Sequence, residues 1–229
     1  MQQWLKFVFL LISISSPQTL ASDESVKVAI GNIYKNQDET TKYGIQVERD
    51  LQAIYAGSGV KAEFTYLPSE RAIQSVMVGE YDALDMRVGM LEKEPQLVKV
   101  DVPLVSIDLY LYSIDGLKYN HLDDLKDQTV VAFQGTRYIK LLKHYKELYL
   151  VQTPKQAALM LTKGRATVWF APEGYYLYIK NMFPNIEKAS PRIARFHLYH
   201  YLHISKSHLL GKIEDSARNF LQSKLTKEQ

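Results

Sequence analysis

A short pattern occurs twice in this chain and decides its fold. The first copy reads Arg71-Ala-Ile-Gln-Ser-Val-Met-Val-Gly79-Glu-Tyr-Asp-Ala83, and the second reads Gln156-Ala-Ala-Leu-Met-Leu-Thr-Lys-Gly164-Arg-Ala-Thr-Val168. Each copy predicts a short apolar helix, a glycine at its end and a short strand. The glycines lie 164 − 79 = 85 residues apart, beyond the period of roughly 20–50 residues typical of solenoid repeats. The pattern therefore predicts two similar α/β units with a ligand-binding cleft between them.

The first 21 residues are typical of a secretory signal peptide. Lys6 supplies the positive charge, residues 7–14 form the apolar segment, and residues 19–21 offer a small-residue cleavage site. The alternative is a membrane anchor, but this apolar run is shorter than the roughly 18–20 residues that a spanning helix needs. We therefore expect cleavage and a free mature chain.

The composition limits both the compartment in which the protein is expected to work and the kind of partner that it is expected to bind. The chain of 229 residues has no cysteine, so in an oxidising compartment it does not depend on disulfides, and with the signal peptide this favours a bacterial periplasm. The formal charge is +3, or +2 without Lys6, and there is no block of lysine and arginine, which argues against nucleic acid as a partner. We expect a monomer that binds a small molecule.

The order of elements reads β-α-β-α-β twice. Strands are expected at residues 26–30, 62–67, 82–88, 109–113, 129–133, 148–151, 167–170 and 199–204. Helices are expected around residues 47–55 (ended by Gly57 and Gly59), from a Ser69 N-cap to Gly79, at 138–146, from a Thr153 capping box to Gly164, after Gly174, and at 207–225. We place the first lobe at residues 22–107, the second at 108–197, and a return strand with a C-terminal helix at 198–229. The hinges are expected near 106–110 and 195–199.

Several passages in this order resemble solute-binding protein family 3, periplasmic proteins that include polar amino-acid receptors of ABC importers. The passages are Pro68-Ser-Glu-Arg71 through Gly79-Glu-Tyr-Asp82, Leu97-Val-Lys-Val-Asp-Val-Pro-Leu104, His121-Leu-Asp-Asp-Leu-Lys-Asp-Gln-Thr-Val-Val-Ala-Phe-Gln-Gly-Thr136, and Tyr201-Leu-His-Ile-Ser205. The resemblance implies an α/β fold of the type II periplasmic binding protein class, with two Rossmann-like lobes joined by a hinge that close on a small solute.

The segment Gln134-Gly135-Thr136-Arg137 is the first candidate for ligand binding. Gly135 allows a close backbone approach, Thr136 offers a hydroxyl at a helix start that suits an anion, and Arg137 can hold a carboxylate with two hydrogen bonds. The alternative is an ordinary strand-to-helix turn capped by Thr136, with Arg137 pointing to water.

Four further residues are candidates, each with a structural alternative. Arg87, after the third strand, can meet an anion, or it can pair with Asp85 or Glu92. Arg71 begins a helix, where a cation favours a nearby anion, but it can also be simply exposed. Tyr34 can stack on a ligand or pack in the core. Glu173 can receive an amine or serve as an acid favoured by a helix N-terminus.

The chain departs from the amino-acid receptors at two positions that the resemblance makes important. Glu94 stands where those receptors have the arginine for the α-carboxylate, and Pro172, next to Glu173, stands where they have the aspartate for the α-ammonium group. An ordinary α-amino acid therefore does not follow from the resemblance, although we expect an amino-acid-like solute that is polar or anionic.

The main functional prediction is a receptor that delivers its solute to an ABC permease. The alternatives are an orphan periplasmic sensor of the same fold and an enzyme resembling cyclohexadienyl dehydratase, with Glu173 as the acid. We expect no catalytic residue, cofactor or metal, because the sequence has no nucleophile elbow, P-loop or dinucleotide motif. His197, His200 and His203 lie in an alternating strand pattern that places the last two on opposite faces.

Overall fold

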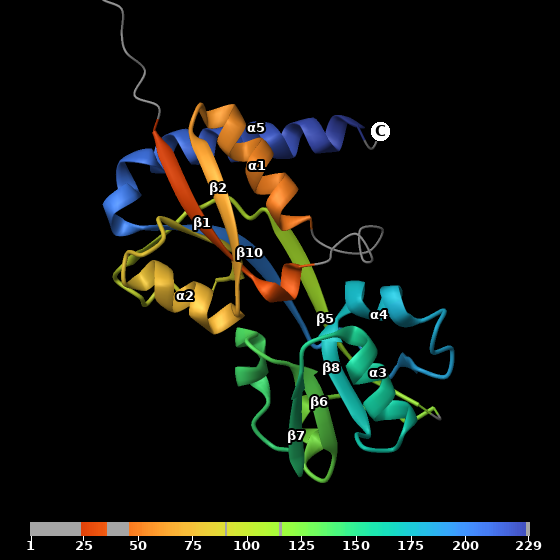
Figure 1. Ribbon diagram of the computed structural model, residues 1–229. Coiled ribbons are helices and arrows are strands. Elements are labelled where there is room, and N and C mark those ends of the chain that lie inside the picture. The colour runs from red at the N-terminus through yellow and green to blue at the C-terminus, as the bar shows by residue number, and fades with distance from the viewer. Residues whose placement is uncertain (1–23, 36–45, 90, 115, 228–229) are drawn as a thin grey trace, which may run out of the picture.

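The computed structural model describes residues 24–35, 46–89, 91–114 and 116–227, and the expected signal peptide at 1–21 lies outside this part. The described strands form one mixed sheet with the order β2-β1-β3-β10-β5-β8-β6-β7. Figure 1 shows the sheet passing through two bodies, each of which has its own helices. Within the described ranges, no helix has the length and apolar character needed to cross a membrane.

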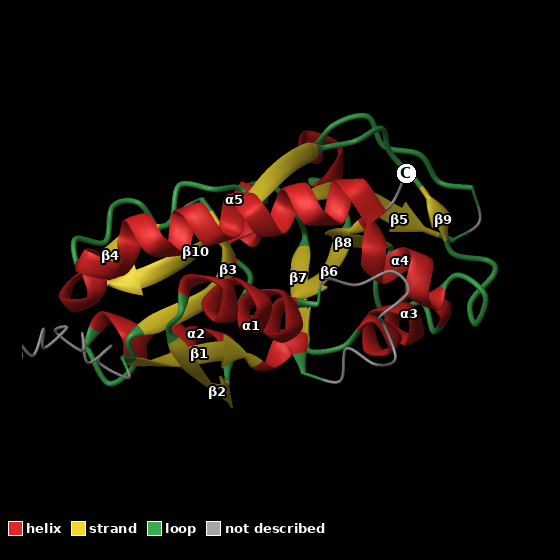
Figure 2. Cartoon of the chain, turned by 90° about the horizontal axis from the view of Figure 1, so that it is seen from above, coloured by secondary structure: helices red, strands yellow, loops and turns green. Residues whose placement is uncertain are grey.

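The first lobe contains the N-terminal elements and the C-terminal helix. Its elements are β1 (Ser25–Gly31), β2 (Lys61–Leu67), β3 (Ala83–Val88), β4 (Leu97–Lys99), α1 (Val47–Ser58), α2 (Ser69–Met77) and α5 (Leu210–Lys227). In β1, Val28 packs in a cluster with α1 and α5, whereas Ala29 packs in a cluster with α2. Figure 2 shows α5 lying lengthwise beside α1. Helices therefore cover both faces of a largely parallel sheet, which explains why β1 is apolar and buried without a break from Val28 to Gly31.

The second lobe contains the remaining strands and two short helices. Its elements are β6 (Thr129–Phe133), β7 (Glu147–Val151), β8 (Val168–Pro172), β9 (Glu187–Lys188), α3 (Pro154–Thr162) and α4 (Glu173–Ile179). β6 pairs in parallel with β7 and β8. Trp169 is fully buried and contacts the rings of Tyr112 and Phe133.

The two copies of the repeated pattern match bond for bond. Gly79 and Gly164 both adopt a left-handed conformation, with φ of 77° and 65°. In the first copy the amide of Glu80 donates to the carbonyl of Ser75, and 85 residues later that of Arg165 donates to Met160. In the sheet, Ala83 and Val168 hold equivalent register positions beside β1 and β6. The helix-glycine-strand prediction is confirmed in both copies.

Two long strands connect the lobes. β5 (Val105–Ser113) and β10 (Ala194–His203) pair antiparallel, from Ala194 opposite Leu109 to Leu198 opposite Val105. Beyond this pair, β5 continues beside β8 and β10 continues beside β3. The segments expected to bend lie in these strands, and their hinge motion stays a prediction.

Several local predictions were wrong. No α-helix forms at residues 138–146, where only the 3-10 helix η4 (Arg137–Leu141) is present. Leu142 is extended, and the Lys146 amide donates to the carbonyl of Gln128 just before β6, so the chain leads into β7 instead of continuing a helix. Ser69 is the first residue of α2 and not its cap, since Pro68 holds that position. Gly57 lies inside α1, and Gly59 alone ends it in a left-handed conformation. The other 3-10 helices are η1 (Asn32–Tyr34), η3 (Leu122–Leu125) and η5 (Ile204–Leu209).

The core of the first lobe contains a histidine that should make stability depend on pH. His200 on β10 is buried, its Nε2 lies 2.8 Å from the hydroxyl oxygen of Tyr55, and burial lowers its pKa to about 4. Since an unfolded histidine titrates near 6.5, the stabilisation is complete above about pH 6.5. It is lost as the pH falls toward 4, by about 3 kcal/mol in total.

Urea unfolding at several pH values between 7 and 4 tests this expectation. We expect a His200→Gln variant to be less stable at pH 7 but to lose less stability on acidification than the wild type. His144 is exposed, so His144→Gln is the matched control and should follow the wild-type profile. Parallel profiles for wild type and His200→Gln would contradict the assignment.

Candidate functional site

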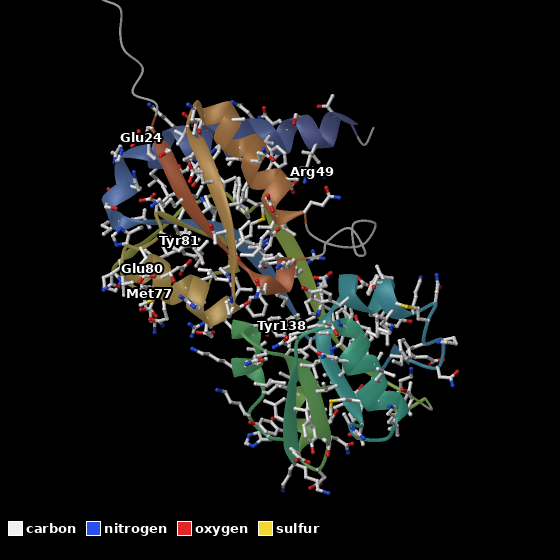
Figure 3. The ribbon with its side chains drawn as sticks, viewed as in Figure 1. Glu24, Arg49, Met77, Glu80, Tyr81 and Tyr138 are labelled. Atoms are coloured by element: carbon white, nitrogen blue, oxygen red, sulfur yellow. The ribbon has the colours of Figure 1, made fainter. Side chains whose placement is uncertain are left out.

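A cavity of about 290 Å³ lies where the two lobes and the connecting strands meet. Tyr34 and Arg87 line it from the first lobe, Ser106 and Asp108 from β5, and residues 135–138 and 172–175 from the second lobe. Figure 3 shows Tyr138 at the junction between the lobes. Most of these residues lie at or just beyond the carboxyl ends of β1, β3, β6 and β8, where open α/β sheets bind ligands.

Arg87 is held by an aspartate on its own strand. Its Nε and Nη2 both donate to the carboxylate of Asp85, the second at 2.9 Å, and the Gly31 amide donates to Asp85 Oδ2 at 2.6 Å. Both side chains are buried. Burial lowers the pKa of Arg87, but the neighbouring groups, with the Asp85 carboxylate first among them, together raise it above its usual value, so the guanidinium is charged. The predicted alternative of an Asp85 pair is therefore present, and Arg87 lines the cavity as well.

The segment 135–137 of the second lobe lies against α2 of the first lobe. Gly135 has a φ of 76°, and a β-carbon there would lie 2.7 Å from Cβ of Ser69 on α2. Arg137 Nη2 donates to Glu70 on the same helix at 3.1 Å. The Thr136 hydroxyl donates to the carbonyl of Phe133 at 2.9 Å and makes no cap bond to η4, so the expected capping role is wrong. Through these contacts the second lobe touches α2 of the first lobe directly.

Three tyrosines surround the cavity, and the sequence singled out only one of them as a binding residue. The Tyr34 hydroxyl donates to the carbonyl of Met86 at 2.8 Å. Tyr138 is buried and its hydroxyl has no hydrogen-bond partner among the described residues. Burial raises the pKa of Tyr138 and of Tyr175, so both are neutral phenols. Tyr138 and Tyr175 follow closely on Arg137 and Glu173, and that adjacency was the available signal.

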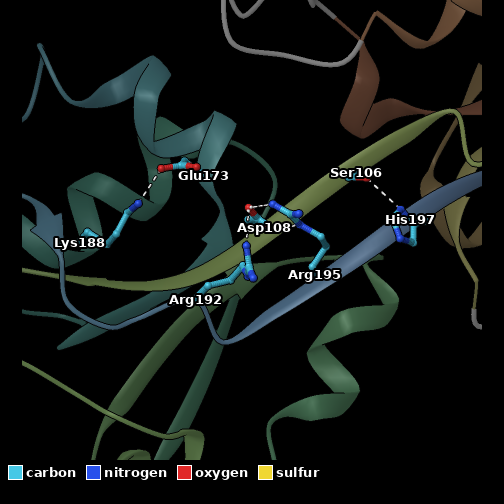
Figure 4. A network of polar contacts seen from close by, with 7 residues as sticks. All are labelled: Ser106, Asp108, Glu173, Lys188, Arg192, Arg195 and His197. Atoms are coloured by element: carbon cyan, nitrogen blue, oxygen red, sulfur yellow. Dashed lines mark hydrogen bonds and ion pairs between the residues drawn. The ribbon is translucent and has the colours of Figure 1, made fainter. Parts of the chain in front are cut away.

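The two remaining carboxylates at the cavity are paired with cations, as Figure 4 shows. Arg195 donates to Asp108 at 2.6 and 2.7 Å, and Arg192 approaches to 3.5 Å. The hydrogen bonds from Arg195 hold the pKa of Asp108 below its usual value. Glu173 lies 2.6 Å from Lys188, whose ammonium also sits 3.7 Å from the ring centre of Tyr110.

Six of the seven predicted binding residues line this one cavity. They are Tyr34, Arg87, Gly135, Thr136, Arg137 and Glu173. Arg71 does not line it and is exposed on α2. Glu70, one position earlier on the helix, points to the second lobe through Arg137, and the next residue of a helix is turned about 100° away. Exposure was the stated alternative for Arg71.

No protein-family model matches the sequence, and comparison with curated proteins finds no match. Solved structures do match over most of the chain. The arginine-bound, truncated ArgBP of T. maritima is 14% identical with a TM-score of 0.70, over 85% of this chain and 95% of that one. A putative L-cystine ABC transporter from Listeria monocytogenes is 17% identical with a TM-score of 0.70, over 87% and 91%. A histidine kinase sensor domain with similarity to periplasmic binding proteins is 16% identical with a TM-score of 0.69, over 89% and 93%.

These similarities confirm the predicted fold. The chain has the α/β fold of the type II periplasmic binding proteins, with a curled mixed sheet. At these identities the likeness concerns the fold, and function must be argued from the site.

Proposed function

We propose that this chain is a periplasmic solute-binding protein that captures a small polar or anionic solute between its lobes and passes it to an ABC permease. The observation that carries the proposal is the cavity itself, which is lined from both lobes and from both strands that connect them. A ligand held there contacts both lobes at once and favours the closed arrangement. The proposal includes export through a cleaved signal peptide, and action as a monomer without cofactor or metal.

A sensor function is the second candidate. The similarity to a histidine kinase sensor domain favours it, because the same fold serves in signalling there. Both functions begin with solute capture and differ only in the membrane partner. The dehydratase alternative needs an acid that is free to contact a substrate in the cavity, whereas the Glu173 carboxylate is already in contact with Lys188 at 2.6 Å.

Thermal unfolding with a library of small solutes tests solute capture. Ligand at a hundred times its Kd adds about 2.7 kcal/mol, which corresponds to a rise of about 5–10 °C in Tm for a protein of this size. We expect at least one carboxylate-bearing solute to give such a rise. A broad library without any stabilising compound would contradict the proposal.

A matched pair of threonine variants tests whether the cavity is the binding site. Thr136 and Thr162 both donate from the hydroxyl to a backbone carbonyl, at 2.9 and 3.0 Å, but only Thr136 lines the cavity. We expect Thr136→Ala to lose most of the ligand-induced rise in Tm and Thr162→Ala to keep it. Equal rises in both variants would show that the solute binds elsewhere.

A further inference from the structure

Each carboxylate at the cavity is already paired with a protein cation, and this restricts the charge of the ligand. Asp108 accepts from Arg195 through both oxygens and is approached by Arg192, and Glu173 is in contact with Lys188. Asp85, behind Arg87, is buried and accepts from that side chain and from Gly31. Among the described residues, no carboxylate at the cavity is without a protein cation. A ligand ammonium group would have to share one of these carboxylates with a protein cation, and the two positive charges would repel each other.

Donors, in contrast, remain available. Arg87 uses Nε and Nη2 on Asp85, and no described residue accepts from its Nη1. Arg137 uses Nη2 on Glu70, while its buried Nε has no partner in the described chain. The buried Tyr138 hydroxyl has none either. Arg87, Arg137 and Tyr138 all line the cavity. Two of the donors, Arg137 Nε and the Tyr138 hydroxyl, are buried without a partner, which is costly unless a ligand supplies an acceptor.

The net charge of the groups at the cavity also favours an anionic ligand. The four charged residues that line the cavity and their partners comprise five cations and four carboxylates. They are Arg87, Arg137, Arg192, Arg195 and Lys188 against Glu70, Asp85, Asp108 and Glu173. The excess of one positive charge favours an anion over a zwitterion.

The rest of the wall is apolar or aromatic. It is formed by Ile33, Val88, Ile107, Leu177 and Leu198 with the rings of Tyr34, Tyr138 and Tyr175. Such a wall fits a hydrocarbon or aromatic body, and the volume of about 290 Å³ limits it to a molecule near the size of an amino acid.

We propose that the solute is a monocarboxylate with an apolar or aromatic body and no amino group, its carboxylate held by Arg87, Arg137 and Tyr138. This rests on the proposed function and specifies its ligand class. The same body with an added α-ammonium group would bind more weakly, because that group loses water without gaining a free carboxylate.

Isothermal titration calorimetry with ligands that share one body tests the proposal. The probes are 3-phenylpropanoate, phenylalanine and 2-phenylethylamine, together with the matching branched set of 4-methylpentanoate, leucine and 3-methylbutylamine. We expect one of the two carboxylates to bind at least tenfold more tightly than its amino acid, and both amines to show no binding. An amino acid that binds as tightly as its carboxylate would overturn the inference.

The outcome also separates this inference from the proposed function. If neither carboxylate binds while another solute stabilises the protein in the library screen, the ligand class is wrong and solute capture stands. If no compound in either experiment binds, both fail.

A second pair of variants tests the role of Glu173 by comparing the preference for carboxylate over amino acid instead of the affinity itself. Lys188→Met frees the Glu173 carboxylate, so we expect the preference for carboxylate over amino acid to shrink at least fivefold. Lys118 is an exposed lysine 3.8 Å from Glu187 and does not line the cavity, so Lys118→Met should leave the preference unchanged. An unchanged preference in Lys188→Met would overturn the assignment of Glu173 as a blocked ammonium acceptor.

Discussion

Replacing Asp85 with alanine is expected to lower the free energy of unfolding by about 3–5 kcal/mol, the cost of leaving one member of a buried ion pair without its partner. Asp85 has no exposed surface and Arg87 is 7% exposed. The variant leaves the guanidinium without its carboxylate and the Gly31 amide without its acceptor. Urea unfolding followed by circular dichroism at pH 7 measures the loss.

The double variant Asp85→Ala/Arg87→Met supplies the control. Because it removes both charges, we expect it to be more stable than Asp85→Ala alone. Replacing both members of a buried ion pair with apolar groups often costs little, whereas removing one member leaves an unpaired buried charge. If the two substitutions simply add, the pair does not contribute as a unit. An exposed pair gives the comparison: Arg218 contacts Glu214 at 3.0 Å with about half of its side chain exposed, and Arg218→Ala should cost less than about 1 kcal/mol.

Gly135→Ala is expected to have the largest effect on ligand binding, with at least a tenfold loss of affinity. The added β-carbon would lie 2.7 Å from Ser69 Cβ, which is fixed to the backbone of α2 and cannot rotate away. Gly135 belongs to the second lobe and Ser69 to the first, so the clash opposes closure. We expect a larger radius of gyration in small-angle X-ray scattering with ligand present, together with the weaker affinity.

Gly164→Ala is the matched control for this variant. Gly164 has a φ of 65°, close to the 76° of Gly135, but a β-carbon there meets nothing within 4 Å. Both variants carry the left-handed strain of about 1–2 kcal/mol, so their Tm values should fall by similar amounts. Only Gly135→Ala should change scattering and affinity. Equal behaviour of the two variants would contradict the role of Gly135 in closure.

Much of the fold was predictable because its signals are local. The stripe of Val47, Leu51, Ile54 and Tyr55 follows helical spacing, and all four residues are buried in α1. The capping box at Thr153 forms, with the Gln156 side chain returning to the Thr153 amide at 3.1 Å. The helix predicted at residues 138–146 failed where tertiary contacts outweigh intrinsic propensity. The N-cap prediction at Ser69 missed the start of α2 by one residue.

The positions of the candidate binding residues were also largely predictable. Tyr34, Arg87, Gly135 and Glu173 lie at or beyond strand ends, and strand ends of such sheets converge on one edge. That they bind a solute stays a prediction. Arg71 was misplaced because one residue along a helix turns a side chain away from the cavity, and the sequence did not fix how α2 faces the second lobe.

By itself, the sequence determined the duplicated scaffold: the two helix-glycine-strand copies at Gly79 and Gly164 follow from periodicity and backbone freedom, which act within a few residues. Only the tertiary structure decided how the charges at the cavity are used. Arg137 meets Glu70 across 67 positions and Arg195 meets Asp108 across 87, and such pairs form only once the lobes and the connecting strands are in place. The scaffold could therefore be predicted from the sequence. The cavity's preference for a carboxylate over an ammonium group could not, because ion pairing depends on distance in space and on burial.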